Sequence, residues 1–266
     1  MTASLIAIAS GKGGVGKTFL AIALAQSFAR LRQRTLLLDG DLGLANIDVQ
    51  LGLQPKGDLL SVVTGRMNMA DAVSAFDGGA GGGGFDVMAG RSGSGALRSL
   101  PARDVHLLGQ SIKMTAARYD RTVVDLGAGL DTTMLDIAAF CGQVLVVLTD
   151  EPTSLTDAYA FIKVISQRPG APALAVVVNM ARDEREAQRT YAALERACIK
   201  FLGFAPPLAG IVRGDPRVRD AIRAQTPYLT RSPAGTAVAG IGKLAATIDT
   251  VFAERSAHPH LAARAQ

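Results

Sequence analysis

Residues 11–18 read GKGGVGKT and come directly after the apolar run SLIAIAS of residues 4–10. Gly11, Gly16, Lys17 and Thr18 satisfy the phosphate-loop pattern G-x-x-x-x-G-K-[ST], which requires a strand before it and a helix after it. Glycines let backbone N–H groups approach a phosphate closely, and the helix that follows presents its positive N-terminal end. The lysine reaches the β- and γ-phosphates, and the threonine hydroxyl is placed to ligate Mg²⁺. The stretch therefore predicts a nucleotide site formed by Gly11, Lys12, Gly13, Gly14, Val15, Gly16, Lys17 and Thr18.

Short aliphatic runs alternate with longer amphipathic stretches along the chain. Strands are predicted at 4–10, 34–40, 85–90, 121–127, 143–149, 173–179 and 207–212, and helices at 18–32, 103–118, 153–167, 184–202 and 235–254. Pro152 and Thr153 predict the start and the cap of the third long helix. This order predicts an α/β fold with a doubly wound, mostly parallel sheet flanked by helices. We expect a single domain over 1–255 and a disordered tail over 256–266.

Composition favours a cytoplasmic protein. Hydrophobic residues make up 48% of the chain, yet no apolar stretch reaches the roughly 18 residues that a membrane span needs, and the first ten residues lack the charged region of a signal peptide. Cys141 and Cys198 are far apart, which fits buried free thiols in a reducing compartment. The net charge of +5 is scattered, so a solvated surface is favoured over an acidic partner.

Aspartates follow two of the predicted strands at their carboxyl ends. Asp39 and Asp41 end the second strand in LLLDGD, and Asp125 ends the run RTVVD in the pattern of a Walker B strand. Carboxylates at this edge could hold Mg²⁺ and polarise a water molecule, although strand-end aspartates also serve as turn and helix caps. Asp125 is predicted to hold the metal, and Gly127 and Gly129 let the next loop follow the γ-phosphate as a switch.

Lys12 is a second lysine in the phosphate loop, and the loop geometry does not require it. A cation beside a triphosphate can neutralise the charge that develops on the transferred phosphoryl group, as an arginine finger does. The alternative is a lysine that is merely solvated on the surface of the loop.

The stretch KGGVGKT resembles the deviant Walker A box, K-G-G-x-G-K-T, of the MinD/ParA family of ATPases. In that family the early lysine reaches the nucleotide of the partner subunit, so the resemblance implies an ATP-dependent homodimer. It further implies that Asp41 orients the attacking water, that Asp39 lies near the metal shell and that Asn179, after the sixth strand, hydrogen-bonds the adenine. No N-K-x-D element that reads guanine is present, so ATP is favoured over GTP. The implied catalytic residues are Lys12, Lys17 and Asp41, the implied metal site comprises Thr18, Asp39 and Asp125, and the cofactors are ATP and Mg²⁺.

Four further segments resemble the FlhG/FleN (YlxH) branch of this family, which regulates the number and placement of flagella. They read DGDLGLANIDVQLGL, MAGRSGSG, YDRTVVDLGAGLD and TDEPTSLTDAYAFIKV. The resemblance implies a slow, partner-regulated ATPase. Its implied protein partner is an FlhF-type GTPase, a flagellar switch protein or a transcription activator.

Two alternatives concern the partner. A ParA-type ATPase that positions DNA or other cargo would share the fold and bind non-specific DNA. A membrane-bound member would contact the inner face of the membrane through a C-terminal amphipathic helix, and an apolar stripe runs through the last predicted helix. That stripe fits a helix packed on the sheet as well, and core packing is favoured. The stripe consists of Val238, Ile241, Leu244, Ile248, Val251 and Phe252.

Overall fold

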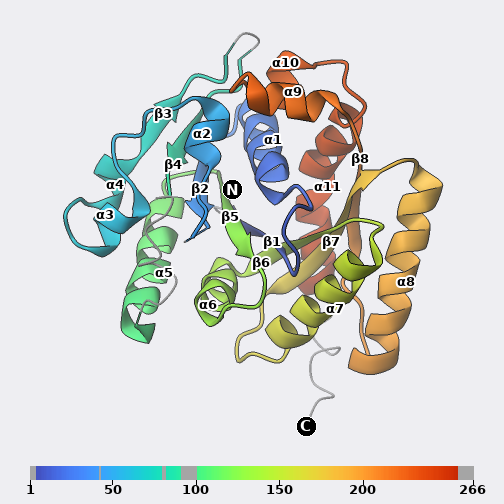
Figure 1. Ribbon diagram of the computed structural model, residues 1–266. Helices are drawn as coiled ribbons and strands as arrows, with labels where there is room; N and C mark the ends of the chain where they lie inside the picture. The colour runs from blue at the N-terminus through green and yellow to red at the C-terminus, as the bar shows by residue number, and fades with distance from the viewer. Residues whose placement is uncertain (1–3, 42, 80–81, 91–100, 257–266) are drawn as a thin grey trace.

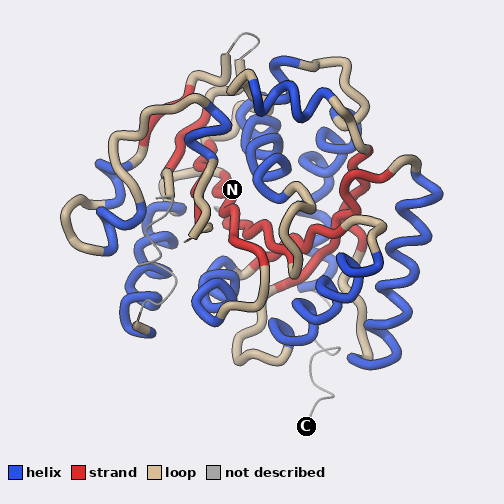
Figure 2. Tube along the Cα trace, viewed as in Figure 1, coloured by secondary structure: helices blue, strands red, loops and turns tan. Residues whose placement is uncertain are grey.

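The computed structural model describes residues 4–41, 43–79, 82–90 and 101–256. Its centre is an eight-stranded sheet with the order β3-β4-β2-β5-β1-β6-β7-β8, in which all neighbouring strands are parallel except β3 and β4 (Figures 1 and 2). The strands are β1 (Ser4–Ser10), β2 (Thr35–Gly40), β3 (Ser74–Phe76), β4 (Phe85–Met88), β5 (Arg121–Ala128), β6 (Gln143–Leu148), β7 (Ala173–Ala181) and β8 (Leu208–Arg213).

Helices cover both faces of this sheet, so the strands are buried on both sides and read as apolar runs. Along β1, for example, Ala7 and Ala9 face one core and Ile6 and Ile8 the other, as the alternation of a strand requires. The first face is covered by α3 (Leu59–Val63), α4 (Met69–Ala72), α5 (Ala102–Ala116), α6 (Thr132–Cys141), α7 (Pro152–Ser166) and α8 (Glu184–Leu202). The second is covered by α1 (Lys17–Arg30), α2 (Ile47–Leu51), α9 (Arg217–Arg223), α10 (Tyr228–Arg231) and α11 (Val238–Ser256).

The predicted fold is confirmed, and each of the seven predicted strands is present with ends that differ by two residues at most. The pattern does not predict β3 or the short helices, because three to seven residues are too few to show a period. Thr153 does not cap α7. The N-cap position is occupied by Glu151 without a side-chain cap, and the Thr153 hydroxyl has a different partner described below.

The apolar stripe of the last helix lies in the core. Ile241, Leu244, Ile248 and Phe252 are at most 2% exposed and belong to the core formed by the second face of the sheet. Asp249 on the same helix pairs with the buried guanidinium group of Arg121 at the start of β5. Core packing therefore accounts for the stripe. The predicted disordered tail lies outside the described residues from 257 onward, and no described helix is long and apolar enough to cross a membrane.

Candidate functional site

The phosphate loop joins β1 to α1, the strand–loop–helix context that its pattern requires. Gly14 and Gly16 have φ angles of 83° and 84°, in the left-handed region where a side chain would be strained. Gly16 occupies the N-cap position of α1, so the free N–H groups of that helix face the loop. Lys17 is 9% exposed, and its burial lowers the pKa of its ammonium while Asp125 and Asp41 oppose that shift.

Two neighbouring segments clamp this loop. A Cβ atom added to Gly11 would lie 2.1 Å from the carbonyl oxygen of Asp157, so α7 packs directly on the loop. On the other side, the Asn179 amide nitrogen donates to the carbonyl oxygen of Val15 at 2.8 Å, and Asn179 is 1% exposed. The buried amide of Asn179 thus holds the loop in place, a role that the sequence did not suggest; its predicted contact with adenine stays a prediction.

Asp125 lies where a cation beside the phosphates would be held. It lies near the carboxyl end of β5, paired in register with Asp39 of β2, and the Thr18 hydroxyl donates to its carboxylate. Its Oδ1 atom is buried without a hydrogen-bond partner. Burial, and secondly the charge of Asp39, raises the pKa of Asp125 to about 8. An orphaned carboxylate oxygen beside a hydroxyl fits the oxygen ligands that Mg²⁺ prefers, and a bound cation would favour the ionised carboxylate.

Asp39 lies beside Asp125, but backbone groups occupy its oxygens. Oδ1 accepts from the N–H of Asp41 at 3.2 Å, and Oδ2 accepts from Asn46 and Ile47 at 2.9 and 3.0 Å. Burial raises the pKa of Asp39 to about 6, and these N–H groups oppose the shift. Asp39 therefore fixes the start of α2. Its place in the metal shell stays a prediction, which requires lone pairs of the carboxylate that the three N–H groups do not occupy.

Asp41 faces the carboxyl end of β5. Its Oδ1 accepts from the N–H groups of Gly43 and Leu44 at 3.1 and 2.9 Å. A Cβ atom added to Gly127 would lie 3.3 Å from the same oxygen, so glycine is the residue that leaves room for the carboxylate here. Asp41 thus meets the segment that is predicted to act as a switch.

Metal binding at this edge would require phosphate oxygens as well. Among the described residues, no group of three or more His, Cys, Asp or Glu side chains is arranged to hold a metal ion. The Thr18 hydroxyl and the Asp125 carboxylate would supply two ligands, and Mg²⁺ commonly completes its octahedron with phosphate oxygens and water.

Lys12 is held by α7. Its Nζ atom donates to the Glu151 carboxylate and to the Thr153 hydroxyl, the latter at 2.8 Å. Its side chain is 34% exposed and that of Glu151 is 59% exposed, so the ion pair lies at the surface. The second lysine of the loop therefore has partners within its own chain.

Comparisons with known proteins agree with this geometry. Residues 6–228 match the family model described as the CobQ/CobB/MinD/ParA nucleotide binding domain. The antiactivator FleN of Pseudomonas aeruginosa is 35% identical over 246 residues, covering 92% of this chain and 86% of FleN. The flagellum site-determining protein YlxH of Helicobacter pylori is 31% identical over 188 residues, covering 70% of this chain and 61% of YlxH. The chain belongs to the MinD/ParA family.

Solved MinD/ParA structures share the fold. The septum site-determining protein MinD of Pyrococcus horikoshii, complexed with Mg-ADP, superposes with a TM-score of 0.77 at 23% identity, covering 93% of this chain and 96% of MinD. The resemblance read from the deviant Walker A box and from the flagellar-branch segments is confirmed. The predicted cofactors, ATP and Mg²⁺, are those of MinD/ParA ATPases, and the Asp125 and Thr18 geometry is compatible with them.

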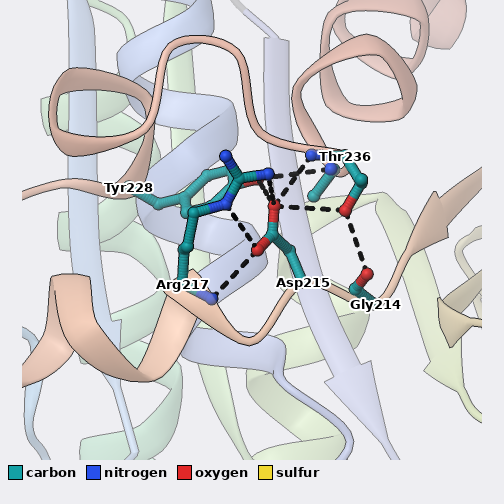
Figure 3. A network of polar contacts seen from close by, with 6 residues as sticks. Gly214, Asp215, Arg217, Tyr228 and Thr236 are labelled. Carbon is teal, nitrogen blue, oxygen red and sulfur yellow. Dashed lines mark hydrogen bonds and ion pairs between the residues drawn. The ribbon is translucent and has the colours of Figure 1, made fainter.

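A polar network fixes the loop at the far end of this MinD/ParA sheet (Figure 3). Asp215, just after β8, has a fully buried carboxylate. It accepts from the backbone and side chain of Arg217, from the Tyr228 hydroxyl at 2.7 Å and from Thr236. The Gly214 N–H donates to the carbonyl of Ala181, the residue that ends β7. The network therefore joins α9, α10 and the start of α11 to the strand end that lies beside the phosphate loop.

Asp215→Asn is expected to lower the free energy of unfolding by about 2 kcal/mol. An amide has one acceptor oxygen in place of two, so some of the groups that donate to Asp215 would lose their hydrogen-bond acceptor. Hydrogen bonds, first those from Arg217, hold the pKa of Asp215 below its ordinary value of 3.8. Its contribution is present above that value and is lost as the pH falls toward the folded-state pKa. Denaturant unfolding followed by circular dichroism measures both effects. Asp220→Asn, an exposed carboxylate on α9, is the control, and equal midpoints for the two variants would contradict the prediction.

Proposed function

We propose that this chain is an ATP-dependent dimerisation switch with slow hydrolysis that controls the number or placement of flagella. Membership of the MinD/ParA family of ATPases and 35% identity with FleN support the general assignment. The observation that carries the finer proposal is Lys12, a second loop lysine that is bonded to the N-terminal end of α7 and is available to another subunit once that pair breaks.

Apolar side chains exposed near the site support a dimer. Leu44, next to Asp41, is 65% exposed, and Leu130, just after Gly129, is 43% exposed. Both follow strand ends, so they lie at the edge of the sheet that carries the phosphate loop. Exposed apolar surface around a nucleotide site favours the binding of a second protein there. The burial of apolar surface is the main favourable term in protein association.

In this account, Asp41 accepts a hydrogen bond from the attacking water and directs its oxygen at the γ-phosphorus. A bond forms between that oxygen and phosphorus while the bond to the β–γ bridging oxygen breaks, giving ADP and inorganic phosphate that carries the two protons of the water. Lys17 and the partner subunit's Lys12 neutralise the charge on the transferred group. Thr18 and Asp125 hold Mg²⁺, which supplies positive charge beside the phosphates when bound.

Nucleotide binding can drive dimerisation only if ATP binds the dimer more tightly than the monomer. A lysine that reaches across the interface to the partner's γ-phosphate provides that difference directly. Slow hydrolysis then sets how long the dimer, and the surface it offers to a protein partner, persists. By analogy with FleN and YlxH, that partner belongs to the flagellar system.

The solution mass tests the switch. Light scattering is measured for the wild type, Lys12→Ala and Asp41→Ala, each with Mg-ADP and with Mg-ATP. We expect ATP to double the mass of the wild type and of Asp41→Ala, and to leave Lys12→Ala monomeric. One mass for all three proteins with either nucleotide would rule out the switch.

Glu151→Gln is expected to strengthen ATP-dependent dimerisation about threefold. A surface ion pair is worth up to about 1 kcal/mol, and removing one charge releases Lys12 from its contact with α7. The protein concentration at which half of the chains are dimeric is measured with a non-hydrolysable ATP analogue. Asp150→Asn alters the adjacent exposed carboxylate and serves as the control. A Glu151→Gln dimer that is no tighter than the control dimer would contradict the prediction.

A second candidate, a ParA-type ATPase that binds non-specific DNA, is favoured by one observation. Arg185, Arg189 and Arg196 are exposed along α8, and no ion pair involves them within the described part of the chain. Unpaired arginines on one helix can contact successive phosphates. Binding of a labelled DNA duplex that weakens steeply with added salt, and is lost in Arg185→Ala/Arg189→Ala, would favour this function.

A further inference from the structure

An apolar groove is lined by residues of α1, α2 and α9, with α1 as its floor. The labels in Figure 1 locate these three helices. Phe19 and Ile22 of α1, Leu51 of α2 and Ala221 of α9 line it, and the ring of Tyr228 closes it. The rings of Phe19 and Tyr228 pack edge to face with centroids 5.4 Å apart. The groove therefore has a firm, mostly hydrocarbon floor.

Two apolar side chains on α2 and α9, the helices that line this groove, are exposed to solvent, one of them next to the lining residue Gln50 and one in the lining itself. Val49 of α2 is 58% exposed, and Ile222 of α9, which lines the groove, is 40% exposed. They lie on the two helices that form opposite walls. Branched aliphatic side chains on both sides of an apolar floor form a surface whose burial by another chain would be favourable.

The walls are tied together at one end. Gln225, just after α9, has a φ of 50°, a left-handed conformation that is uncommon for a residue with a side chain. Its amide nitrogen donates to the carbonyl of Val49 at 2.9 Å, and a Cβ atom added to Gly52 would lie 3.2 Å from its Cβ. Gln225 therefore links the end of α9 to α2 through a side-chain hydrogen bond.

Positive charge flanks the open side. With about 100° per residue, Arg219 and Arg223 lie about 60° and 100° around α9 from Ile222, whereas Asp220 lies about 160° away. Both arginines are exposed, and within the described residues neither forms an ion pair. Arg217 is neutralised by Asp215 and does not add to this charge. The rim of the groove beside Ile222 is therefore basic.

The helices that line the groove are connected to the nucleotide site. Phe19 directly follows Thr18, α2 begins at Ile47, whose N–H is held by Asp39, and α9 begins after the Asp215 turn. A molecule seated here would contact elements anchored to both sides of the phosphate loop.

We propose that this groove docks an acidic amphipathic helix of a protein partner, with apolar side chains against Phe19, Val49 and Ile222 and carboxylates against Arg219 and Arg223. Helices bind in this way when anchors at i, i+3, i+4 and i+7 enter an apolar groove between two helices. The proposal goes beyond the dimerisation switch, and it applies to the ADP-bound monomer.

The probe is a fluorescein-labelled helical peptide with leucine and phenylalanine at i, i+3, i+4 and i+7 and glutamate elsewhere. Its anisotropy is titrated with the Mg-ADP protein, so a failed dimerisation switch would not affect the result. We expect saturable binding to the wild type and about tenfold weaker binding to Arg219→Glu/Arg223→Glu. Val49→Ser/Ile222→Ser should lose binding, while Met114→Ser, which alters an exposed methionine on α5, should retain it.

Three outcomes would overturn the proposal. The first is no binding, or equal binding of a peptide with lysine in place of glutamate. The second is loss of the ATP-dependent mass increase in Val49→Ser/Ile222→Ser, which would assign the groove to a second copy of the chain. The third is binding of labelled duplex DNA that the arginine variant abolishes, which would assign the basic rim to nucleic acid. Circular dichroism of each variant excludes unfolding as the cause of a loss.

Discussion

Lys12→Ala is expected to bind ATP with nearly the affinity of the wild type and to hydrolyse it at least about 100-fold more slowly. Its own phosphates are bound by Lys17, by the loop N–H groups and by the N-terminal end of α1, none of which the substitution changes. In the proposed dimer the substitution removes a cation that would face the transferred phosphoryl group of the other subunit, and such fingers are worth about 10³–10⁵ in rate. The affinity for ATP should therefore change little while the rate of hydrolysis falls.

Binding of a fluorescent ATP analogue and release of phosphate measure the two quantities. Lys163→Ala, which removes an exposed lysine from α7, is the matched control and should leave both unchanged. If Lys12→Ala weakened ATP binding and hydrolysis in parallel, Lys12 would act as a ligand in its own subunit. If it changed neither, Lys12 would be a solvated loop lysine.

Asp41→Ala is expected to form the ATP dimer and to remain in it, with hydrolysis reduced about 10²–10⁴-fold, the usual contribution of a group that positions or deprotonates the attacking water. The side chain also accepts from the N–H groups of Gly43 and Leu44, so the alanine variant removes local structure as well. Asp41→Asn keeps an oxygen for those bonds but lacks the carboxylate charge.

The two variants separate structure from chemistry. Single-turnover phosphate release should be equally slow in Asp41→Ala and Asp41→Asn, and ADP should leave each protein at the wild-type rate. Asp104→Ala on α5 is the control. Hydrolysis that is normal in Asp41→Asn but lost in Asp41→Ala would show that Asp41 only folds the turn, and the water would then be positioned by another group.

Sequence patterns predict those parts of the site whose residues are adjacent in the chain or end predicted strands. The phosphate loop is one continuous segment, and Asp39 and Asp125 end apolar strand runs, so parallel strands bring them to one edge. The same patterns also predict every long strand. They say nothing of Glu151, which holds Lys12 from 139 residues away, because a salt bridge across the fold leaves no local period.

Asn179 and Asp215 show a second limit. The pattern places Asn179 at a strand end, but only packing reveals that its amide is buried against the phosphate loop. Asp215 resembles an ordinary turn residue, and its partners Tyr228 and Thr236 are 13 and 21 residues away. The groove between α2 and α9 is likewise invisible in the sequence, since helices of five and seven residues are too short to show a periodic apolar face.

The most direct test of the central claim is hydrolysis by a mixture of two inactive variants. In a heterodimer of Lys12→Ala with Asp41→Ala, the nucleotide site of the Lys12→Ala subunit keeps its own Asp41 and receives the partner subunit's Lys12. If Lys12 acts across the interface, phosphate release should reappear on mixing and rise with an excess of Asp41→Ala. If Lys12 acts within its own subunit, both sites stay defective, and the mixture would remain as inactive as either variant alone.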